Sequence, residues 1–283
     1  MMSSDSQPAT AVATTVIRSS DSAWTLGWAD LARHRELLYF LTWRDIKVRY
    51  KQTALGIAWA ILQPLAVALA LAAFLGRVVH MASDDLPYPV FAYAGMVIWQ
   101  LFAQGLIESS NSVVNNERLI SKVYFPRLLI PLSAILASLL DFAISLLVLV
   151  LFLIYFRIEP TGAVVLFPLF VLPVILSSLG AGLWLSALNV KFRDVRYTIS
   201  FLVQFWFFAT PVAYPLSSVP TRWRLLYELN PMVGALEGFR WALRGQGAFP
   251  AESVMFAIFT GTALLLTGLY YFRRTEDTFA DFI

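Results

Sequence analysis

The chain has 283 residues, of which 59% are hydrophobic and 14% charged, well below the roughly 25% charged residues of an ordinary soluble domain. It has no cysteine and two histidines, which excludes disulfides, thiolate metal sites and a histidine cluster that could bind a metal. The net charge of +3 and the pI near 9.2 could indicate nucleic-acid binding in a soluble protein. Here the basic residues flank apolar segments, so no nucleic-acid partner is expected.

The N-terminal part of the chain is polar. Residues 1–29 are rich in Ser, Thr and Ala and lack the apolar core of a signal peptide, so they are predicted to form a flexible cytoplasmic tail. The segment 30–51 has helical periodicity, and its aromatic and basic residues form adjacent stripes, Tyr39, Trp43 and Tyr50 beside Arg44, Lys47 and Lys51. This pattern is typical of an amphipathic helix in the headgroup layer. The cations either anchor this helix alone or also bind a lipid diphosphate.

Six long segments with almost no charge follow this helix. A bilayer core of about 30 Å needs about 20 apolar residues in a helix, because hydrocarbon offers no partner for unpaired backbone groups. All six segments are long enough, and one of them contains a single acidic residue, Asp141. The sequence therefore predicts an all-α integral membrane domain over 52–272, with six transmembrane helices at 52–76, 86–107, 128–156, 160–190, 197–221 and 253–272.

The lysines and arginines indicate how this domain is oriented. With a cytoplasmic N-terminus, fifteen of the 21 lie on the inside and six on the outside. Because cytoplasmic loops carry the excess of Lys and Arg, both termini are predicted to be cytoplasmic, including the C-terminal tail at 273–283. The chain is then a multi-pass protein of the plasma membrane.

The cytoplasmic loop 108–127 has features of a docking element. Asn115 or Asn116 can cap a short helix whose apolar residues and polar residues fall on opposite sides. Pro126 ends this helix. A solvated loop would need no apolar face, so the pattern favours contact with a partner protein.

The outer loop 214–252 is long and contains two tryptophans. Asn230 and Pro231 are predicted to separate two short helices, because proline disfavours helix at the residue before it. In the second helix, apolar residues recur at helical spacing opposite polar ones: Met232, Leu236, Phe239 and Leu243 opposite Glu237, Arg240 and Arg244. Such a pair either re-enters the membrane as a gate or rests on its surface, and we favour the gate.

Within the membrane, aromatic residues gather in the first and fifth spans. They are either ordinary core and lipid-facing residues or the lining of a path along which sugar rings slide. Asp141 lies near the middle of its span, where a charged group is costly unless it is paired. We expect it to be structural and hydrogen-bonded to a neighbouring helix, with a proton relay as the alternative.

The sequence shows no means of powering transport by itself. It has no Gly-rich phosphate loop followed by Lys and Ser or Thr, so it is not expected to bind ATP. It also lacks the paired intramembrane carboxylates and inverted repeats that ion-coupled carriers tend to show. A channel or a permease driven by a separate ATPase remains, and the docking loop favours the permease.

Several separated motifs support this conclusion: RDIKVRYKQTALGIAWAILQP (44–64), NERLISKVYFPRLLIP (116–131), LNVKFRDVRY (188–197), LNPMVGALEGFRWAL (229–243) and EDTFADFI (276–283). Together they resemble the permease subunit of bacterial polysaccharide ABC exporters. The likeness is greatest to the Wzm-type O-antigen branch, with teichoic-acid exporters as near relatives. It covers roughly residues 30–283.

The resemblance implies a homodimeric six-helix permease that works with two copies of a cytoplasmic ATPase. The ATPase binds ATP and Mg, so this chain needs no cofactor of its own. The implied cargo is a polysaccharide linked to undecaprenyl diphosphate, carried across the bacterial inner membrane. Membrane lipids are a further expected partner.

The same resemblance implies roles for individual residues. The ATPase-coupling helix would comprise Glu117, Arg118, Leu119, Ser121, Lys122, Tyr124 and Phe125. The cytoplasmic entrance for the lipid diphosphate would comprise Arg44, Lys47, Arg49 and Lys51. The lining of the path would include Trp59, Phe201, Phe205 and Phe208. The outer gate would include Trp223, Met232, Leu236, Phe239 and Arg240.

Other functions are weaker alternatives. The cargo could instead be a teichoic acid or a capsular polysaccharide. A membrane enzyme acting on lipid-linked sugars would need a converging acid, base or metal site, whereas the carboxylates are scattered between Asp84, Asp85, Asp141 and Asp194. An ion-coupled secondary transporter is the third alternative.

Overall fold

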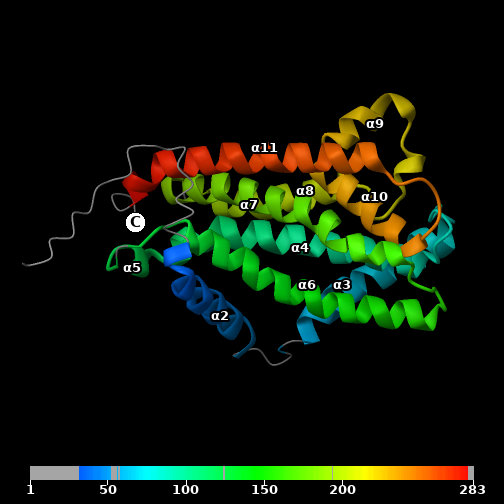
Figure 1. Cartoon of the computed structure of the whole chain (residues 1–283), viewed down its shortest axis with the longest axis horizontal. Helices are drawn as coiled ribbons and strands as arrows, with labels where there is room; N and C mark the ends of the chain where they lie inside the picture. The colour runs from blue at the N-terminus through cyan, green and yellow to red at the C-terminus, as the bar shows by residue number, and fades with distance from the viewer. Residues whose placement is uncertain (1–31, 52–55, 57, 124, 193, 280–283) are drawn as a thin grey trace, which may run out of the picture.

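The computed structural model describes residues 32–51, 56, 58–123, 125–192 and 194–279. Throughout these residues the chain forms helices joined by turns and loops (Figure 1), without a strand. This confirms the all-α membrane class. In a bilayer, a helix is the structure that lets a single apolar segment pair its own backbone groups.

Within the described residues, five helical segments are long and apolar enough to cross a membrane. The first consists of α3 (Ala58–Leu71) and the π-helical η1 (Ala72–Val78), and the second is α4 (Tyr88–Asn115). The third is α6 (Leu129–Tyr155), and the fourth is η2 (Gly162–Leu166) continued by α7 (Phe167–Lys191). The fifth is α11 (Ala251–Thr275) with the short η4 (Glu276–Thr278).

The segment predicted as a fifth transmembrane helix, 197–221, differs from the other spans. Its helix α8 (Val195–Phe208) has 14 residues, which span about 21 Å at 1.5 Å per residue and are short of a full crossing. Pro211 follows soon after its end, and proline disfavours helix at the preceding residue. The chain then turns into η3 (Leu216–Ser218), α9 (Thr221–Glu228) and α10 (Pro231–Arg244). The six-crossing topology therefore stays a prediction.

Helix α4 forms the centre of the bundle, with α6, α7, α10 and α3 packed around it and α11 against α7. The contact between α7 and α11 depends on glycine. A Cβ atom on Gly180 would lie 2.4 Å from the Leu264 carbonyl carbon, and one on Gly268 would lie 2.2 Å from the Gly180 carbonyl oxygen. Such small residues let membrane helices approach closely, which increases dispersion contact where no hydrophobic force joins helices.

The shorter helices lie at opposite ends of this bundle (Figure 1). Helix α2 (Arg35–Lys51) and helix α5 (Glu117–Ile120) are at the end where the described chain finishes, and α9 and α10 are at the other end. Helix α2 packs mainly against α6. A second hydrophobic cluster at the α5 end joins residues of α2, α4, α6, α7 and α11. The fold thus separates the predicted coupling and gate elements by the length of the membrane spans.

Candidate functional sites at the two ends of the bundle

Two of the four predicted entrance cations, Arg44 and Arg49, form ion pairs with carboxylates of the same chain. Arg44 binds the neighbouring Asp45, with Nη2 2.7 Å from Oδ1, and Asp45 Oδ2 accepts a hydrogen bond of 2.9 Å from Ser133 on α6. Arg49 Nη1 donates to Asp141 Oδ2 on α6, and Arg49 Nη2 lies 3.5 Å from Glu108 Oε1 on α4. Arg49 therefore connects α2 to two membrane helices.

Asp141 forms the hydrogen bond to a neighbouring helix that is expected from the sequence, and its partner is Arg49 of α2. Its side chain is 14% exposed and that of Arg49 is 22% exposed, so both charges are largely withdrawn from water. Leaving either partner alone in such a place is costly, whereas the pair offsets much of that cost. The sequence could not supply this partner because Arg49 and Asp141 are 92 positions apart.

Lys47 and Lys51 differ from the arginines, because both side chains are exposed. They line a cavity of about 450 Å³ whose described lining residues all belong to α2. Its other lining residues are Phe40, Trp43, Arg44 and Val48. We call it the cationic cavity. Three cations beside two aromatic rings match the headgroup layer, where phosphates meet ammonium groups and rings lie at the apolar boundary.

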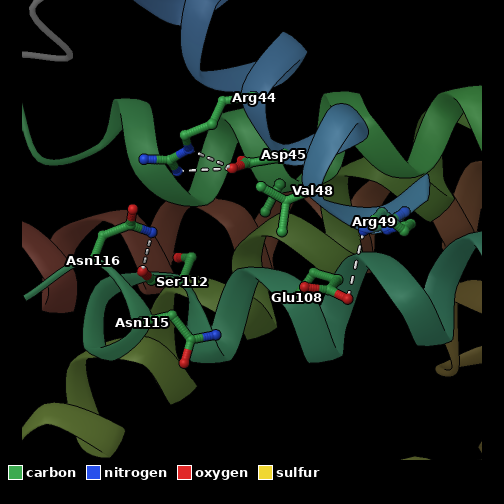
Figure 2. A pocket seen from close by; sticks show the side chains of 9 residues that line it. Arg44, Asp45, Val48, Arg49, Glu108, Ser112, Asn115 and Asn116 are labelled. Atoms are coloured by element: carbon green, nitrogen blue, oxygen red, sulfur yellow. Dashed lines mark hydrogen bonds and ion pairs between the residues drawn. The ribbon is translucent and has the colours of Figure 1, made fainter. Parts of the chain in front are cut away.

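A second cavity of about 450 Å³ lies between α2 and α4 (Figure 2). Helix α2 contributes Arg44, Asp45, Val48 and Arg49. Helix α4 and the residue after it contribute Glu108, Ser112, Asn115 and Asn116, and Ala134 of α6 completes the lining. We call it the polar cavity. It shares Arg44 and Val48 with the cationic cavity, so the two are neighbours.

The predicted coupling helix is a single turn, and its side chains divide into two groups. Glu117, Arg118, Ser121 and Lys122 are exposed, Leu119 is half-buried, and Phe125 is buried in the second hydrophobic cluster together with Ile120. Tyr124 lies outside the described residues. Asn116 is the N-cap residue of α5, as predicted, but its side chain makes no capping bond, because Asn116 Nδ2 donates instead to the Ser112 carbonyl at 2.8 Å, back along α4. The polar side of α5 faces outward, and its apolar side packs within the chain.

The C-terminal segment packs beneath this loop, which the sequence analysis did not foresee. Phe279 is 1% exposed and forms an edge contact with Phe272, with ring centroids 5.3 Å apart. The Arg127 guanidinium, which follows the coupling helix, lies 6.0 Å from the Phe279 ring centroid. Glu276 accepts a hydrogen bond of 2.8 Å from Arg273. The signal available in the sequence was the aromatic residues Phe279 and Phe282 in a tail that otherwise consists largely of polar residues.

The predicted path-lining aromatics lie on the surface of the chain. Trp59 is 57% exposed, and Phe201, Phe205 and Phe208 are exposed along one face of α8. The intervening rings face inward, since Trp206 packs on Phe102 and Phe207 on Trp99, with centroids 4.9 and 5.4 Å apart. The aromatic residues of α8 thus divide into a packed side and a free side. Path lining by the free side stays a prediction.

At the opposite end, the predicted break between two short helices is confirmed. Helix α9 ends at Glu228 and α10 begins at Pro231, with Asn230 as the cap. The Asn230 side chain accepts hydrogen bonds of 3.1 Å from the Met232 amide and the Trp206 indole. Residues of α9 are half-buried or exposed, including Trp223, which is 48% exposed. Helix α10 is deeply packed, with Met232, Leu236 and Phe239 fully buried.

The prediction that Arg240 lies on a polar face of α10 is wrong. Arg240 is 3% exposed, and its Nη1 and Nη2 donate to the Pro211 and Val212 carbonyls at 2.8 and 2.5 Å. Its guanidinium carbon lies 3.6 Å from the Phe91 ring centroid on α4. A guanidinium offers several fixed donors and a flat face, so Arg240 satisfies the carbonyls exposed where α8 ends.

Glu237 accompanies Arg240 on α10. Burial raises the pKa of the Glu237 carboxyl above its usual range, and the guanidinium groups of Arg240 and Arg244 partly offset this effect. Arg244 in turn lies near Asp84, with Nη1 4.0 Å from Oδ2. The polar residues of α10 therefore interact with one another and with Asp84 within the packed end of the bundle.

Long helical spans, with a short loop helix at one end and a helical pair at the other, indicate a multi-pass membrane protein. The chain belongs to the ABC-2 type transporter family, whose model matches residues 36–243. This match covers most of the described bundle from α2 to α10 and confirms the predicted resemblance.

Individual relatives agree with the family. The chain is 32% identical over 258 residues to the O-antigen export system permease protein RfbA of Myxococcus xanthus, covering 90% of this chain and 98% of the relative. It is 30% identical over 249 residues to the RfbA protein of Klebsiella pneumoniae, covering 88% and 95%. It is also 28% identical over 242 residues to the polysialic acid transport protein KpsM of Escherichia coli, covering 83% and 91%. These relatives are transport proteins, as predicted for this chain.

Proposed function

We propose that this chain is the permease subunit of an ATP-driven exporter that moves a lipid-linked polysaccharide out of the cytoplasm across the bacterial inner membrane. The observation that carries this proposal is the similarity to O-antigen export permeases over nearly their whole length. The similarity to KpsM supports a capsular polysaccharide as the second candidate cargo. Both cargoes would use the same permease architecture.

The proposed assembly contains two copies of this chain and two copies of a cytoplasmic ATPase, which binds ATP and Mg. The exposed residues Glu117, Arg118, Ser121 and Lys122 would contact the ATPase. Because Ile120 and Phe125 are anchored in the chain's own hydrophobic cluster, a push on the loop is transmitted to the membrane helices. Packed helices move as nearly rigid bodies, so such a displacement can tilt one half of the channel.

The proposed entrance for the lipid diphosphate is the cationic cavity. Lys47 and Lys51 are exposed and carry no ion pair among the described residues, so their charges are available to phosphate. Arg49 is engaged with Asp141 and Glu108 and instead positions α2. The four cations predicted for the entrance thus take two different roles.

The free side of α8 would line the path when two copies meet. Phe201, Phe205 and Phe208 offer flat apolar faces to sugar rings without a deep binding site. At the outer end, α9 would form the mobile part of the gate, because its side chains are half-buried or exposed. Helix α10 would serve as the fixed base against which α9 closes.

The test of the proposal is reconstitution of the chain with the ATPase in vesicles, followed by measurement of ATP-dependent polymer export. We expect the double substitution of Lys47→Ala and Lys51→Ala to reduce export at least several-fold while the complex assembles normally. The matched control is Arg35→Ala, which removes an exposed cation at the other end of α2. Export without ATP, or equal export by the double variant and the control, would contradict the proposal.

A further inference from the structure

The two neighbouring cavities beside α2 differ in chemistry although they have the same volume of about 450 Å³. Among the described residues, the cationic cavity is lined by three cations and no carboxylate. The polar cavity is lined by two cations and two carboxylates, so its formal charge is balanced. Volumes of this size fall within the range of small-molecule sites in proteins, about 300 to 1,000 Å³. The two cavities therefore differ in the charge of the ligand that each would favour.

The charges of the polar cavity are already paired with one another. Arg44 binds Asp45 at 2.7 Å, and Arg49 lies 3.5 Å from Glu108. An anion entering this cavity would meet the Asp45 and Glu108 carboxylates without a free cation to offset them. A diphosphate is thus favoured in the cationic cavity and disfavoured in the polar one.

The polar cavity nevertheless retains unused hydrogen-bonding groups. The Asn115 side chain makes no hydrogen bond within the described part of the chain, and Asn116 uses its Nδ2 on Ser112 while its Oδ1 accepts none there. Figure 2 shows both asparagines at the end of α4 that lines the cavity, with Arg44 and Asp45 of α2 on its other side. An amide supplies two donors and an acceptor, and carboxylates add acceptors.

Neutral hydroxyl-rich molecules match this combination of donors and acceptors, because each hydroxyl both donates and accepts. We propose that the polar cavity binds the sugar that directly follows the lipid diphosphate, while the diphosphate occupies the cationic cavity. Arg44 and Val48 line both cavities, and this closeness matches two covalently joined parts of one ligand. This inference depends on the proposed function and makes the entrance selective for glycosylated lipid.

The test uses the full-length chain with its ATPase in lipid nanodiscs. Two probes are titrated separately, undecaprenyl diphosphate and undecaprenyl diphosphate carrying one N-acetylglucosamine, and the ratio of their dissociation constants is the readout. We expect the wild-type complex to bind the glycosylated probe about 10-fold more tightly, as a few net hydrogen bonds would provide. Asn115→Leu, which removes the amide and fills part of the cavity, should reduce this ratio to about 1 to 2.

Lys47→Ala is the matched control in the neighbouring cavity. It should weaken the binding of both probes by a similar factor of about 3 to 10 and leave the ratio of their dissociation constants unchanged. Should Asn115→Leu fail to assemble, Asn115→Ala tests the same amide without added bulk and should reduce the ratio about 3-fold. Free N-acetylglucosamine at equal concentration should not compete, since the diphosphate holds the sugar in place.

The possible failures are distinguishable. An unchanged ratio in the Asn115 variants, combined with Lys47-dependent binding of both probes, would overturn the sugar site and leave the proposed entrance standing. Binding of either probe that is insensitive to Lys47→Ala would overturn the entrance and the sugar site together.

Discussion

The connection between α2 and the membrane helices gives a prediction that can be worked out quantitatively. Arg49→Met removes a cation whose partner, Asp141, is 14% exposed. Removing one partner of a buried pair costs about 3–5 kcal/mol, and partial exposure reduces this figure. Protonation sets an upper limit, because an aspartic acid of ordinary pKa near 3.9 costs about 4 kcal/mol to protonate at pH 7. We therefore expect a loss of about 3 kcal/mol in the free energy of unfolding.

The opposite single substitution should cost less. In Asp141→Leu, Arg49 keeps Glu108 at 3.5 Å as an alternative partner, so we expect a loss of about 1 kcal/mol. The double variant removes both charges from the same contact, and replacing a buried pair by apolar groups is often close to neutral. Its loss should be about 1 kcal/mol, which leaves about 3 kcal/mol of interaction between the two residues.

Thermal unfolding of the purified chain in detergent measures these differences. At about 2–4 °C per kcal/mol, Arg49→Met should lower the Tm by about 6–12 °C, and the double variant by about 2–4 °C. Arg35→Met is the control for loss of a cation from the same helix at an exposed site. If the double variant loses as much Tm as the two single variants together, Arg49 and Asp141 do not interact and this account of α2 is refuted.

Three further predictions concern other contacts. Arg240→Met should destabilise the chain by about 3–5 kcal/mol, because two buried carbonyls lose their donors. The same Tm measurement checks this prediction. A variant that makes reconstituted vesicles leaky without lowering the Tm would instead favour a gating role for Arg240. Phe279→Ala should increase amide hydrogen exchange over 117–129 about 10-fold or more, unlike Thr278→Ala at an exposed neighbour. Gly180→Ala should cost about 1–3 kcal/mol by clashing with α11, whereas Gly162→Ala, with open space around it, should not.

Much of the fold was predictable because hydrocarbon imposes simple requirements on a chain. Five of the six predicted spans coincide with long helices, since length and apolarity alone decide them. The segment 197–221 escaped this reasoning because Pro211 and the turn around it carry no charge. A count of uncharged residues therefore could not detect where α8 ends.

The sites were less predictable because their contacts are not local. Helical periodicity placed Arg240 opposite an apolar stripe, but it could not show that the carbonyls of Pro211 and Val212 lie within reach. Likewise, the stripe of cations on α2 gave no reason to separate Arg49 from Lys47. That separation follows from carboxylates supplied by α4 and α6.

Helices α2 and α10, at the two ends of the bundle, are held by different kinds of contact, and this difference affects the free-energy cost of displacing each helix. In α2, Leu41 is the buried residue, and the remaining connections are ion pairs and hydrogen bonds at partly exposed sites. The more exposed of these contacts contribute modestly and can be exchanged for water or for another partner, so the Arg49–Asp141 pair is the main connection that must break before α2 moves. Helix α10 is buried along nearly its whole length, so moving it would expose apolar surface at about 25 cal/mol per Å². A conformational change driven from the α5 end, as proposed above, would therefore displace α2 at lower cost than α10.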